Sequence, residues 1–406
     1  MGSQLYFYRK TLLWANTTGH RSRNRWICHS VFALFNIPVL FVIALRPHLL
    51  TLPEWFKLTM VYPFYIWHFS WFLIFLLVII WKIFAFPVWG LKKISGFSKT
   101  PVQSPPPDAL PPVTPPSLNS PLIEVNHGRR LFIRRGTTVL VGSAFLGTAY
   151  STYGRDQYTI EDISIPIKGL PLQFEGFSIG MISDVHSSIF MTKEQMQIYA
   201  RAVNALKTDL IVVTGDFVNS MLDEVHPFAE AFSELSAPHG VFGVLGNHDY
   251  FTKQVDLVAK EVDQCGIHVL RNESVIIDRN GAKLALMGSD DIGIYRRAEV
   301  VFDSLIKGLS PGIPTILLCH RPYFFPQAAE RNIDLTLSGH THGGQIVFAK
   351  LGNEVIAPAR FASPYMAGTY TIGHSNMYVN RGLGTVGIPM RLNCPPELTK
   401  IKLIRA

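Results

Sequence analysis

The sequence predicts an α/β domain with a parallel or mixed sheet, preceded by transmembrane helices. In the second half of the chain, short apolar runs that resemble buried strands alternate with stretches of helical pattern, which favours parallel or mixed strand pairing. Polar clusters follow several of these runs, and ligands gather outside the carboxyl ends of such strands. In the first half, long runs carry no charged residue, as membrane-spanning helices do.

A membrane region with two helices is predicted over residues 1–91. The runs at 26–45 and 58–81 are free of formal charge. Either run is long enough to cross about 30 Å of hydrocarbon as a helix. A buried helical hairpin in a soluble domain would have a similar composition, but two such runs in succession favour the membrane interpretation.

A proline-rich linker is predicted over residues 92–128. Consecutive prolines stand at 105–107, 111–112 and 115–116. Proline at this density prevents a packed core and favours an extended, semi-rigid chain. The linker would hold the body away from the membrane surface or run along that surface.

Residues 129–154 combine a basic cluster with a third apolar segment. Four arginines lie within 129–135, and residues 136–154 carry no charge. This pattern is similar to a twin-arginine export signal or to a membrane segment that precedes a catalytic domain. Because the apolar run contains glycines and threonines, it could also be an interfacial helix that lies on the bilayer. We favour a spanning helix.

The positive charge is concentrated in the first third of the chain. Residues 1–135 contain 15 basic and 3 acidic residues, a net charge of +12, whereas the remainder contains 22 and 26, a net charge of −4. This distribution disfavours nucleic-acid binding by the body and favours anionic lipid headgroups as the partner of the basic region. Positive-inside counting places the basic residues before residue 26 and those of 82–135 in the cytoplasm. The body then lies outside the cytoplasm if 136–154 spans, and inside if it does not.

The cysteines do not indicate a disulfide framework or a cysteine zinc site. Cys28, Cys265, Cys319 and Cys394 are scattered, and no C-x-x-C motif is present. We expect four separate thiols.

Residues 155–406 are predicted to form one α/β body. A capping box at Thr192 begins a helix that ends near Leu206, and a second helix is expected from Thr252 to Gly266. The pair Asn280-Gly281 predicts a β-hairpin turn. The expected strands are residues 177–182, 210–213, 241–245, 316–318, 333–337 and 398–404.

Five of the expected strands end in a polar cluster. The clusters are SDVH at 183–186, TGD at 214–216, GNHD at 246–249, CH at 319–320 and GHTHGG at 339–344. If strand alternation continued beyond residue 337, His340 and His342 would project to the same face and aim at one point. Imidazoles and carboxylates at strand ends suit metal binding. A single His-x-His is more often a solvated loop, but five clusters at five strand ends are hard to obtain by chance.

In this order, the motifs resemble those of the calcineurin-like metallophosphoesterase superfamily, D-x-H, G-D, G-N-H-[DE], H and G-H-x-H. All five blocks are present, and the resemblance extends over about residues 177–405. The third apolar segment followed by this body resembles the membrane-tethered, YkuE-like branch, and the first half of the chain lies outside the resemblance. The resemblance implies a four-layer αββα sandwich, with helices outside two facing mixed sheets and the site along one rim.

The resemblance also implies two divalent metal ions. Histidine, aspartate and asparagine ligands suit manganese, iron or zinc better than calcium. Asp216 would bridge the two ions. One ion would be held by Asp184, His186, Asp216 and His342, and the other by Asp216, Asn247, His320 and His340.

Two further residues have catalytic roles by resemblance. His248 would protonate or stabilise the leaving oxygen, and Asp249 would orient the His248 imidazole. Arg381 lies in a pattern common in the membrane-tethered branch, where it is either a phosphate contact or a surface arginine.

Together these features predict a membrane-anchored, multi-pass phosphohydrolase, in the inner or plasma membrane if the protein is bacterial. Its substrate would be a phosphomonoester, a phosphodiester or a pyrophosphate. The YkuE-like resemblance implies lipid-linked substrates such as UDP-2,3-diacylglucosamine, which would require a cytoplasmic site. The alternative is a membrane scaffold with an inert phosphoesterase-like domain that binds phosphorylated partners. A nuclease is disfavoured because the body is not basic.

Overall fold

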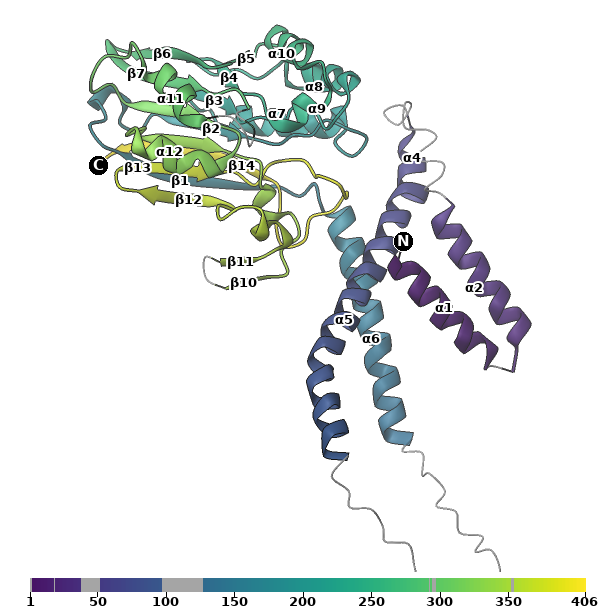
Figure 1. Cartoon of the computed structure of the whole chain (residues 1–406). Coiled ribbons are helices and arrows are strands. Elements are labelled where there is room, and N and C mark those ends of the chain that lie inside the picture. The colour runs from purple at the N-terminus through teal and green to yellow at the C-terminus, as the bar shows by residue number, and fades with distance from the viewer. Residues whose placement is uncertain are drawn as a thin grey trace, which may run out of the picture. The chain divides into compact units, whose positions relative to one another are not determined.

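The computed structural model describes residues 2–17, 19–37, 52–96, 127–291, 293, 297–351 and 354–406. The chain divides into two compact units (Figure 1). The first, which we call the helical unit, comprises Met1–Val39 and Pro63–Ala149. The second, the α/β unit, comprises Leu40–Tyr62 and Tyr150–Ala406.

The helical unit is built from four helices in its described residues. Aromatic contacts connect them, such as Phe35 stacked on Trp67 with ring centroids 4.4 Å apart. The helices are α1 (Gly2–Asn16), α2 (Arg21–Asn36), most of α5 (Tyr62–Gly96) and most of α6 (His127–Tyr153). A short helix α4 (Glu54–Phe56) and a π-helical turn (Lys57–Val61) lead into α5 and belong to the α/β unit.

One helix in the described part of the chain, Glu54–Pro87, is long and apolar enough to cross a membrane. It contains the predicted span at 58–81. The predicted span at 26–45 lies partly in α2, and its residues 38–45 fall outside the described residues, as do residues 97–126 of the predicted linker. The third predicted segment lies in α6, which is long enough at 27 residues but not apolar enough to be a candidate span.

The α/β unit contains two six-stranded mixed sheets, as predicted. In the first sheet, β14 pairs in parallel with β1 and antiparallel with β2, and the remaining pairs are parallel. Its order is β1 (Thr159–Ile167), β14 (Glu397–Arg405), β2 (Ser178–Ile182), β3 (Leu210–Val213), β4 (Val241–Gly243) and β5 (His268–Val269).

The second sheet has a parallel centre and antiparallel edge pairs. Its order is β12 (Gly368–Ile372), β13 (Ser375–Val379), β9 (Leu335–Ser338), β8 (Thr315–Leu318), β7 (Ala282–Gly288) and β6 (Glu273–Arg279). A separate hairpin of β10 (Ala349–Leu351) and β11 (Glu354–Ile356) follows β9.

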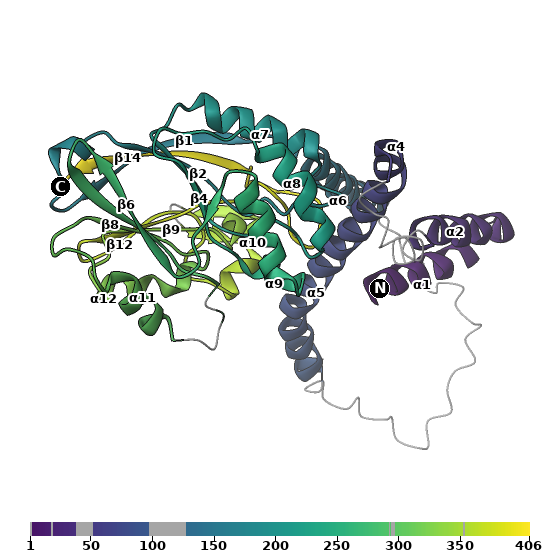
Figure 2. The same ribbon diagram turned by 90° about the horizontal axis from the view of Figure 1, so that it is seen from above.

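Alternation along the central strands produces the layers. In β3, Leu210 and Val212 join the apolar core between the sheets, whereas Ile211 and Val213 pack with the helices on the outer face. In β8, Leu318 faces the same central core and Leu317 faces the opposite outer helices. The first outer layer contains α7 (Lys193–Ala205), α8 (Val225–Phe232) and α10 (Val255–Gln264), and the second contains α11 (Ala298–Ile306) and α12 (Phe325–Glu330). The layers are therefore helices, sheet, sheet and helices (Figure 2).

Local signals explain most of the elements. Thr192 accepts a hydrogen bond from the Gln195 amide at the start of α7, which confirms that predicted cap. The turn between β6 and β7 has positive φ at Asn280 and Gly281, which confirms the hairpin. The second helix begins at Val255, not at Thr252, because the Thr252 hydroxyl donates to the Asp249 carbonyl and accepts from the Gln254 amide.

Candidate metal centre

The predicted ligands lie on loops that leave five parallel strands at one rim of the sandwich. Asp184 and His186 follow β2, Asp216 follows β3, and Asn247 begins the short helix α9 (Asn247–Phe251) after β4. His320 follows β8, and the pair His340 and His342 follows β9. Because these strands run in parallel within each sheet, their carboxyl ends bring the loops together.

The backbone at this rim is unusually strained. Among the described residues, twelve that are not glycine have a positive φ, and five of them are predicted ligands. This conformation is rare for residues with a side chain and costs roughly 1–3 kcal/mol each, so its concentration at one rim indicates a functional site. The five are Asp184 (49°), His186 (49°), Asp216 (55°), His340 (73°) and His342 (51°).

The side chains of His340 and His342, the two histidines of the GHTHGG segment, point towards different neighbours. Strand β9 ends at Ser338, and the positive φ values of His340 and His342 interrupt the strand alternation. His340 turns towards His320, whereas His342 turns towards His186. The prediction that both imidazoles aim at one point is therefore wrong.

A first group of donors brings together Asp184, His186 and His342. The Nε2 atoms of His186 and His342 are 3.0 Å apart. The His342 Nε2 lies 3.5 Å from an oxygen of Asp184, and the His186 Nε2 lies 3.5 Å from an oxygen of Asp216. We call this set group A.

A second group of donors contains Asp216, His320, His340 and Asn247. The His320 Nε2 lies 3.2 Å from an oxygen of Asp216 and 3.3 Å from the side-chain oxygen of Asn247. The His340 Nδ1 lies 3.2 Å from the His320 Nε2. We call this set group B. Asp216 contacts histidines of both groups, which is the arrangement expected of a bridging carboxylate.

Close approach of the loops depends on glycine. A Cβ atom at Gly339 would collide with the Asp184 carboxylate, and one at Gly246 would collide with the Asp216 carboxylate. Backbone amides near these glycines hold the carboxylates in place. The His340 amide donates to Asp184 at 2.9 Å, and the His248 amide donates to Asp216 at 2.8 Å. The glycines of these motifs are therefore required by packing around the carboxylates.

The electrostatics of the rim fit divalent cations. Burial, with the nearby charge of Asp216, raises the pKa of Asp184 to about 6. Burial alone would lower the pKa of His320, but the charge of Asp216 and its hydrogen bond raise it to about 10. Burial lowers the pKa of His186 to about 3, which leaves a neutral imidazole able to ligate.

Buried carboxylates gather at this rim, in a region where buried charges need partners. Asp184, Asp216 and Asp249 are all fully or almost fully buried. The buried Nδ1 of His186 also has no hydrogen-bond partner among the described residues. Bound divalent cations would balance the carboxylates and use the converging nitrogen atoms, so this donor set fits metal ions.

His248 lies beside both groups but is held differently from the prediction. Its ring is 4.5 Å from that of His186, and its Nδ1 is 2.6 Å from the Asn219 carbonyl oxygen. The Asp249 carboxylate instead accepts hydrogen bonds from backbone amides, at 2.8–3.1 Å. The donors are the amides of Asp216, Val218 and Gly246.

The prediction that Asp249 orients the His248 imidazole is therefore wrong. Asp249 lies in the first turn of α9, where its side chain turns back to the free amides at the start of the helix. It fixes the loop that carries Asp216, and the Asn219 carbonyl fixes the orientation of His248.

Sequence reasoning missed Tyr323, which contacts group B. Its hydroxyl is 2.6 Å from the His340 Nε2 and accepts a hydrogen bond from Arg321 at 3.2 Å. Arg321 is itself held by Asp291 through two hydrogen bonds. The only signal in the sequence is that Arg321 and Tyr323 come directly after His320.

Arg391 was also missed, and Arg381 is held by two carboxylates. The buried Arg391 guanidinium donates to the Gly384 carbonyl at 2.6 Å and lies 3.4 Å from the His342 Nδ1, and no local motif marks it. Arg381 forms ion pairs with Glu161 at 2.7 Å and Glu397 at 2.9 Å. These partners engage its guanidinium, which favours the alternative of an arginine after a strand over a phosphate contact.

Comparisons with known proteins agree with this geometry. The calcineurin-like phosphoesterase family matches residues 177–344. The metallophosphoesterase YkuE of Bacillus subtilis is 31% identical over 68% of this chain and 97% of that protein. The phosphodiesterase YaeI of Escherichia coli is 29% identical over 56% of this chain and 82% of that protein.

A relative with a membrane part is also similar. The transmembrane protein with metallophosphoesterase domain of Bos taurus is 30% identical over 68% of this chain. The match spans 63% of that protein, which is less than two thirds of its length. Its name and the apolar helix Glu54–Pro87 both point to membrane association. From the five motifs, the convergent donors and the near-complete coverage of YkuE, it follows that this chain belongs to the calcineurin-like metallophosphoesterase family.

Proposed function

We propose that this chain is a membrane-anchored phosphohydrolase that uses two divalent metal ions. The observation that carries the proposal is the pair of donor groups that share Asp216 at one rim. Group A would hold one ion and group B the other, with Asp216 between them. Manganese, iron or zinc fit these histidine-rich sets better than calcium.

The ions would supply charge neutralisation and an activated nucleophile for attack on phosphorus. The protein's own contribution begins with His248. Because its Nδ1 is engaged by the Asn219 carbonyl, its Nε2 is the nitrogen left to donate a proton to the leaving oxygen. The Asp249 carboxylate holds the backbone of Asp216 and Val218, which fixes the bridging position relative to His248.

The substrate class is a phosphoester or a pyrophosphate. The name of the relative YaeI, a phosphodiesterase, supports a phosphodiester. The apolar helix Glu54–Pro87 supports a substrate that resides at a bilayer. We therefore propose a lipid-linked phosphate. UDP-2,3-diacylglucosamine, an example that rests on family resemblance, requires a cytoplasmic site and fits only if 136–154 does not span.

We also propose that the anchor is multi-pass. The helix Glu54–Pro87 would be one span, and the runs at 26–45 and 136–154 would supply the others, with the linker 92–128 between spans. A reporter fused after Ala406 tests this topology. If residues 136–154 span, the reporter is active outside the cytoplasm, and activity only in the cytoplasm contradicts a third span.

Hydrolysis of bis(p-nitrophenyl) phosphate by the full-length protein in detergent tests the enzymatic proposal. We expect turnover with manganese and its loss with a chelator. p-Nitrophenyl phosphate, assayed in parallel, separates diester from monoester preference. Activity that survives chelation contradicts metal-dependent chemistry, and an inactive protein that still binds metal supports the scaffold alternative.

A further inference from the structure

The hairpin that follows the metal-binding turn carries an exposed apolar surface. Four large apolar side chains lie within fourteen residues, on β10, on β11, on the 3₁₀ turn Pro358–Phe361 and directly before β10. Single exposed apolar residues are normal on soluble proteins, but such a concentration marks an interaction surface. We call it the hairpin surface; its members are Phe348 (43% exposed), Leu351 (67%), Ile356 (49%) and Phe361 (99%).

The base of this segment is packed on the α/β unit. Val347 and Ala357 are buried together with Cys394. The Val347 amide donates to the Leu392 carbonyl at 3.0 Å, and the Asn393 side chain donates to the Val347 carbonyl at 3.0 Å. The base of the hairpin is therefore fixed, and its apolar side chains are exposed on a folded element.

The same stretch of chain connects the hairpin to the end of α6. The Arg391 amide donates to the Ser151 carbonyl in the last turn of α6 at 2.9 Å, and Arg391 directly precedes Leu392. One short segment of the α/β unit thus contacts the last turn of α6 on one side and the base of the hairpin on the other.

The start of the apolar helix is held by the same unit. The Tyr62 hydroxyl accepts a hydrogen bond from Arg155 at 2.7 Å, and Lys57 donates to the Ile189 carbonyl at 3.2 Å. Tyr153 at the end of α6 donates to the Leu58 carbonyl at 3.5 Å. The candidate span Glu54–Pro87 therefore leaves the α/β unit beside the end of α6.

Aromatic side chains at these helix ends match a membrane interface. Trp55 is 63% exposed, Tyr150 is 74% exposed and Tyr153 is 52% exposed, and tryptophan and tyrosine are enriched at the headgroup level. Lys350 on β10 and Arg360 on the 3₁₀ turn supply cations for anionic headgroups near the hairpin surface.

We propose that the hairpin surface inserts into the interfacial layer of the phospholipid bilayer in which the chain is anchored. This inference rests on the membrane anchoring in the proposed function. Since the hairpin begins five residues after Gly344, at the end of the turn that carries His342, insertion would set the rim at the depth of the phosphate headgroups. Lipid-linked phosphates could then reach the rim without leaving the bilayer.

Site-specific fluorescence in the full-length protein tests this inference. Cys28 and Cys265, the two partly buried cysteines, are replaced by serine, and single cysteines are introduced as Leu351→Cys or Phe361→Cys. Each is labelled with an environment-sensitive nitrobenzoxadiazole dye. The protein is placed in nanodiscs of phosphatidylcholine and phosphatidylglycerol, with and without lipids that carry a doxyl quencher on the acyl chain.

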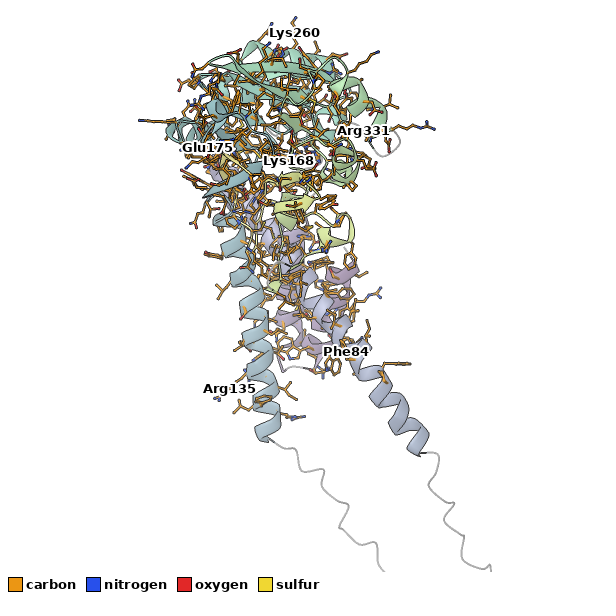
Figure 3. The ribbon with its side chains drawn as sticks, turned by 90° about the vertical axis from the view of Figure 1, so that its left-hand side faces the viewer. Phe84, Arg135, Lys168, Glu175, Lys260 and Arg331 are labelled. Atoms are coloured by element: carbon orange, nitrogen blue, oxygen red, sulfur yellow. The ribbon has the colours of Figure 1, made fainter. Side chains whose placement is uncertain are left out.

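Leu172→Cys is the matched control. Leu172 is 72% exposed, close to the value for Leu351. It lies beyond the carboxyl end of β1, a nine-residue strand that spans about 30 Å and begins next to the end of α6. Lys168 and Glu175, on either side of it in the sequence, are labelled in Figure 3 on the body formed by the two large sheets.

We expect the dyes at 351 and 361 to emit at shorter wavelength and to lose emission with the doxyl lipids, while the dye at 172 does neither. Emission at 351 and 361 like that at 172 overturns the inference. A blue shift without quenching also overturns it, because a second copy of the chain would then cover the surface. Manganese-dependent hydrolysis by the same samples is a separate readout. Active protein with unquenched dyes refutes only the hairpin inference, whereas inactive protein with quenched dyes refutes only the enzymatic proposal.

Discussion

The two donor groups at the rim differ in how deeply they are buried and in what holds them. In group A, Asp184, His186 and His342 are at most 5% exposed. In group B, His320 is equally buried, but His340 and Asn247 are only partly buried. Group A is the closed side of the site and group B is the open side.

The two groups also differ in the contacts that hold their donors in position. All three donors of group A have a strained, left-handed backbone, and the Arg391 guanidinium packs beside His342. Asp216 and His340 of group B share this left-handed backbone, so the main chain contributes to the geometry of both groups. His340 is held in addition by a side-chain contact with Tyr323. Because group B is the open side, substrate should approach from that side.

Replacement of Asp216 should have the largest effect, because this residue belongs to both groups. We expect Asp216→Asn to lower the rate by roughly 10³-fold or more, since the charge between the two sites is lost. Hydrolysis and metal content, measured together on the purified protein, check this. Asp223→Asn, an exposed acid in the following loop, is the control and should behave as wild type. Loss of metal from only one group would contradict the bridging role.

His248 should affect catalysis without affecting either group. We expect His248→Asn to lower kcat by roughly 10²–10⁴-fold, because proton donation to the leaving oxygen is lost. The loss should be smaller with a p-nitrophenyl ester, whose leaving group needs little protonation, than with an alkyl ester. Equal losses for both esters, or loss of bound metal, would argue against this role. His226→Asn, at an exposed position, is the control.

The contrast between the groups also shows what the sequence could predict. The bounds of β3 were predicted correctly, because the apolar run Leu210–Val213 lies in a fully buried strand that ends in a polar turn. The motifs placed the seven predicted ligands at the strand ends where the structure has them, because each motif is a short stretch of sequence that directly follows a strand. The bounds of β3 and the positions of the ligands both depend on short stretches of sequence.

The errors concern features that depend on the main chain or on distant segments. The directions of His340 and His342 follow from left-handed φ values that strand alternation does not predict. Asp249 was misassigned because its partners are backbone amides, which no residue type reveals. Arg391 reaches His342 from 49 residues away, and only the folded chain brings the two together.

Asp249 supports the loop between the groups, and its removal should reduce stability. Asp249→Ala leaves three buried backbone amides without an acceptor, each worth about 1–3 kcal/mol, so we expect unfolding free energy to fall by roughly 3 kcal/mol or more. Denaturant unfolding in detergent measures this. Asp278→Ala, which removes one exposed bond to the Gly281 amide, is the control and should cost much less. Equal stability of the two variants would contradict the structural role of Asp249.

Replacement of Tyr323 should have the smallest effect on activity and should distinguish the two groups most clearly. Its hydroxyl contacts His340 of group B and no donor of group A. Tyr323→Phe keeps the ring but removes this hydrogen bond, and loss of such a support typically weakens metal affinity by about 10–100-fold. We expect a two-site metal titration to show weaker binding at one site only, with the other unchanged. Tyr365→Phe, which alters a tyrosine packed against Phe325, is the control. If both sites weakened equally, the two groups would not be independent, and the division into a closed side and an open side would fail.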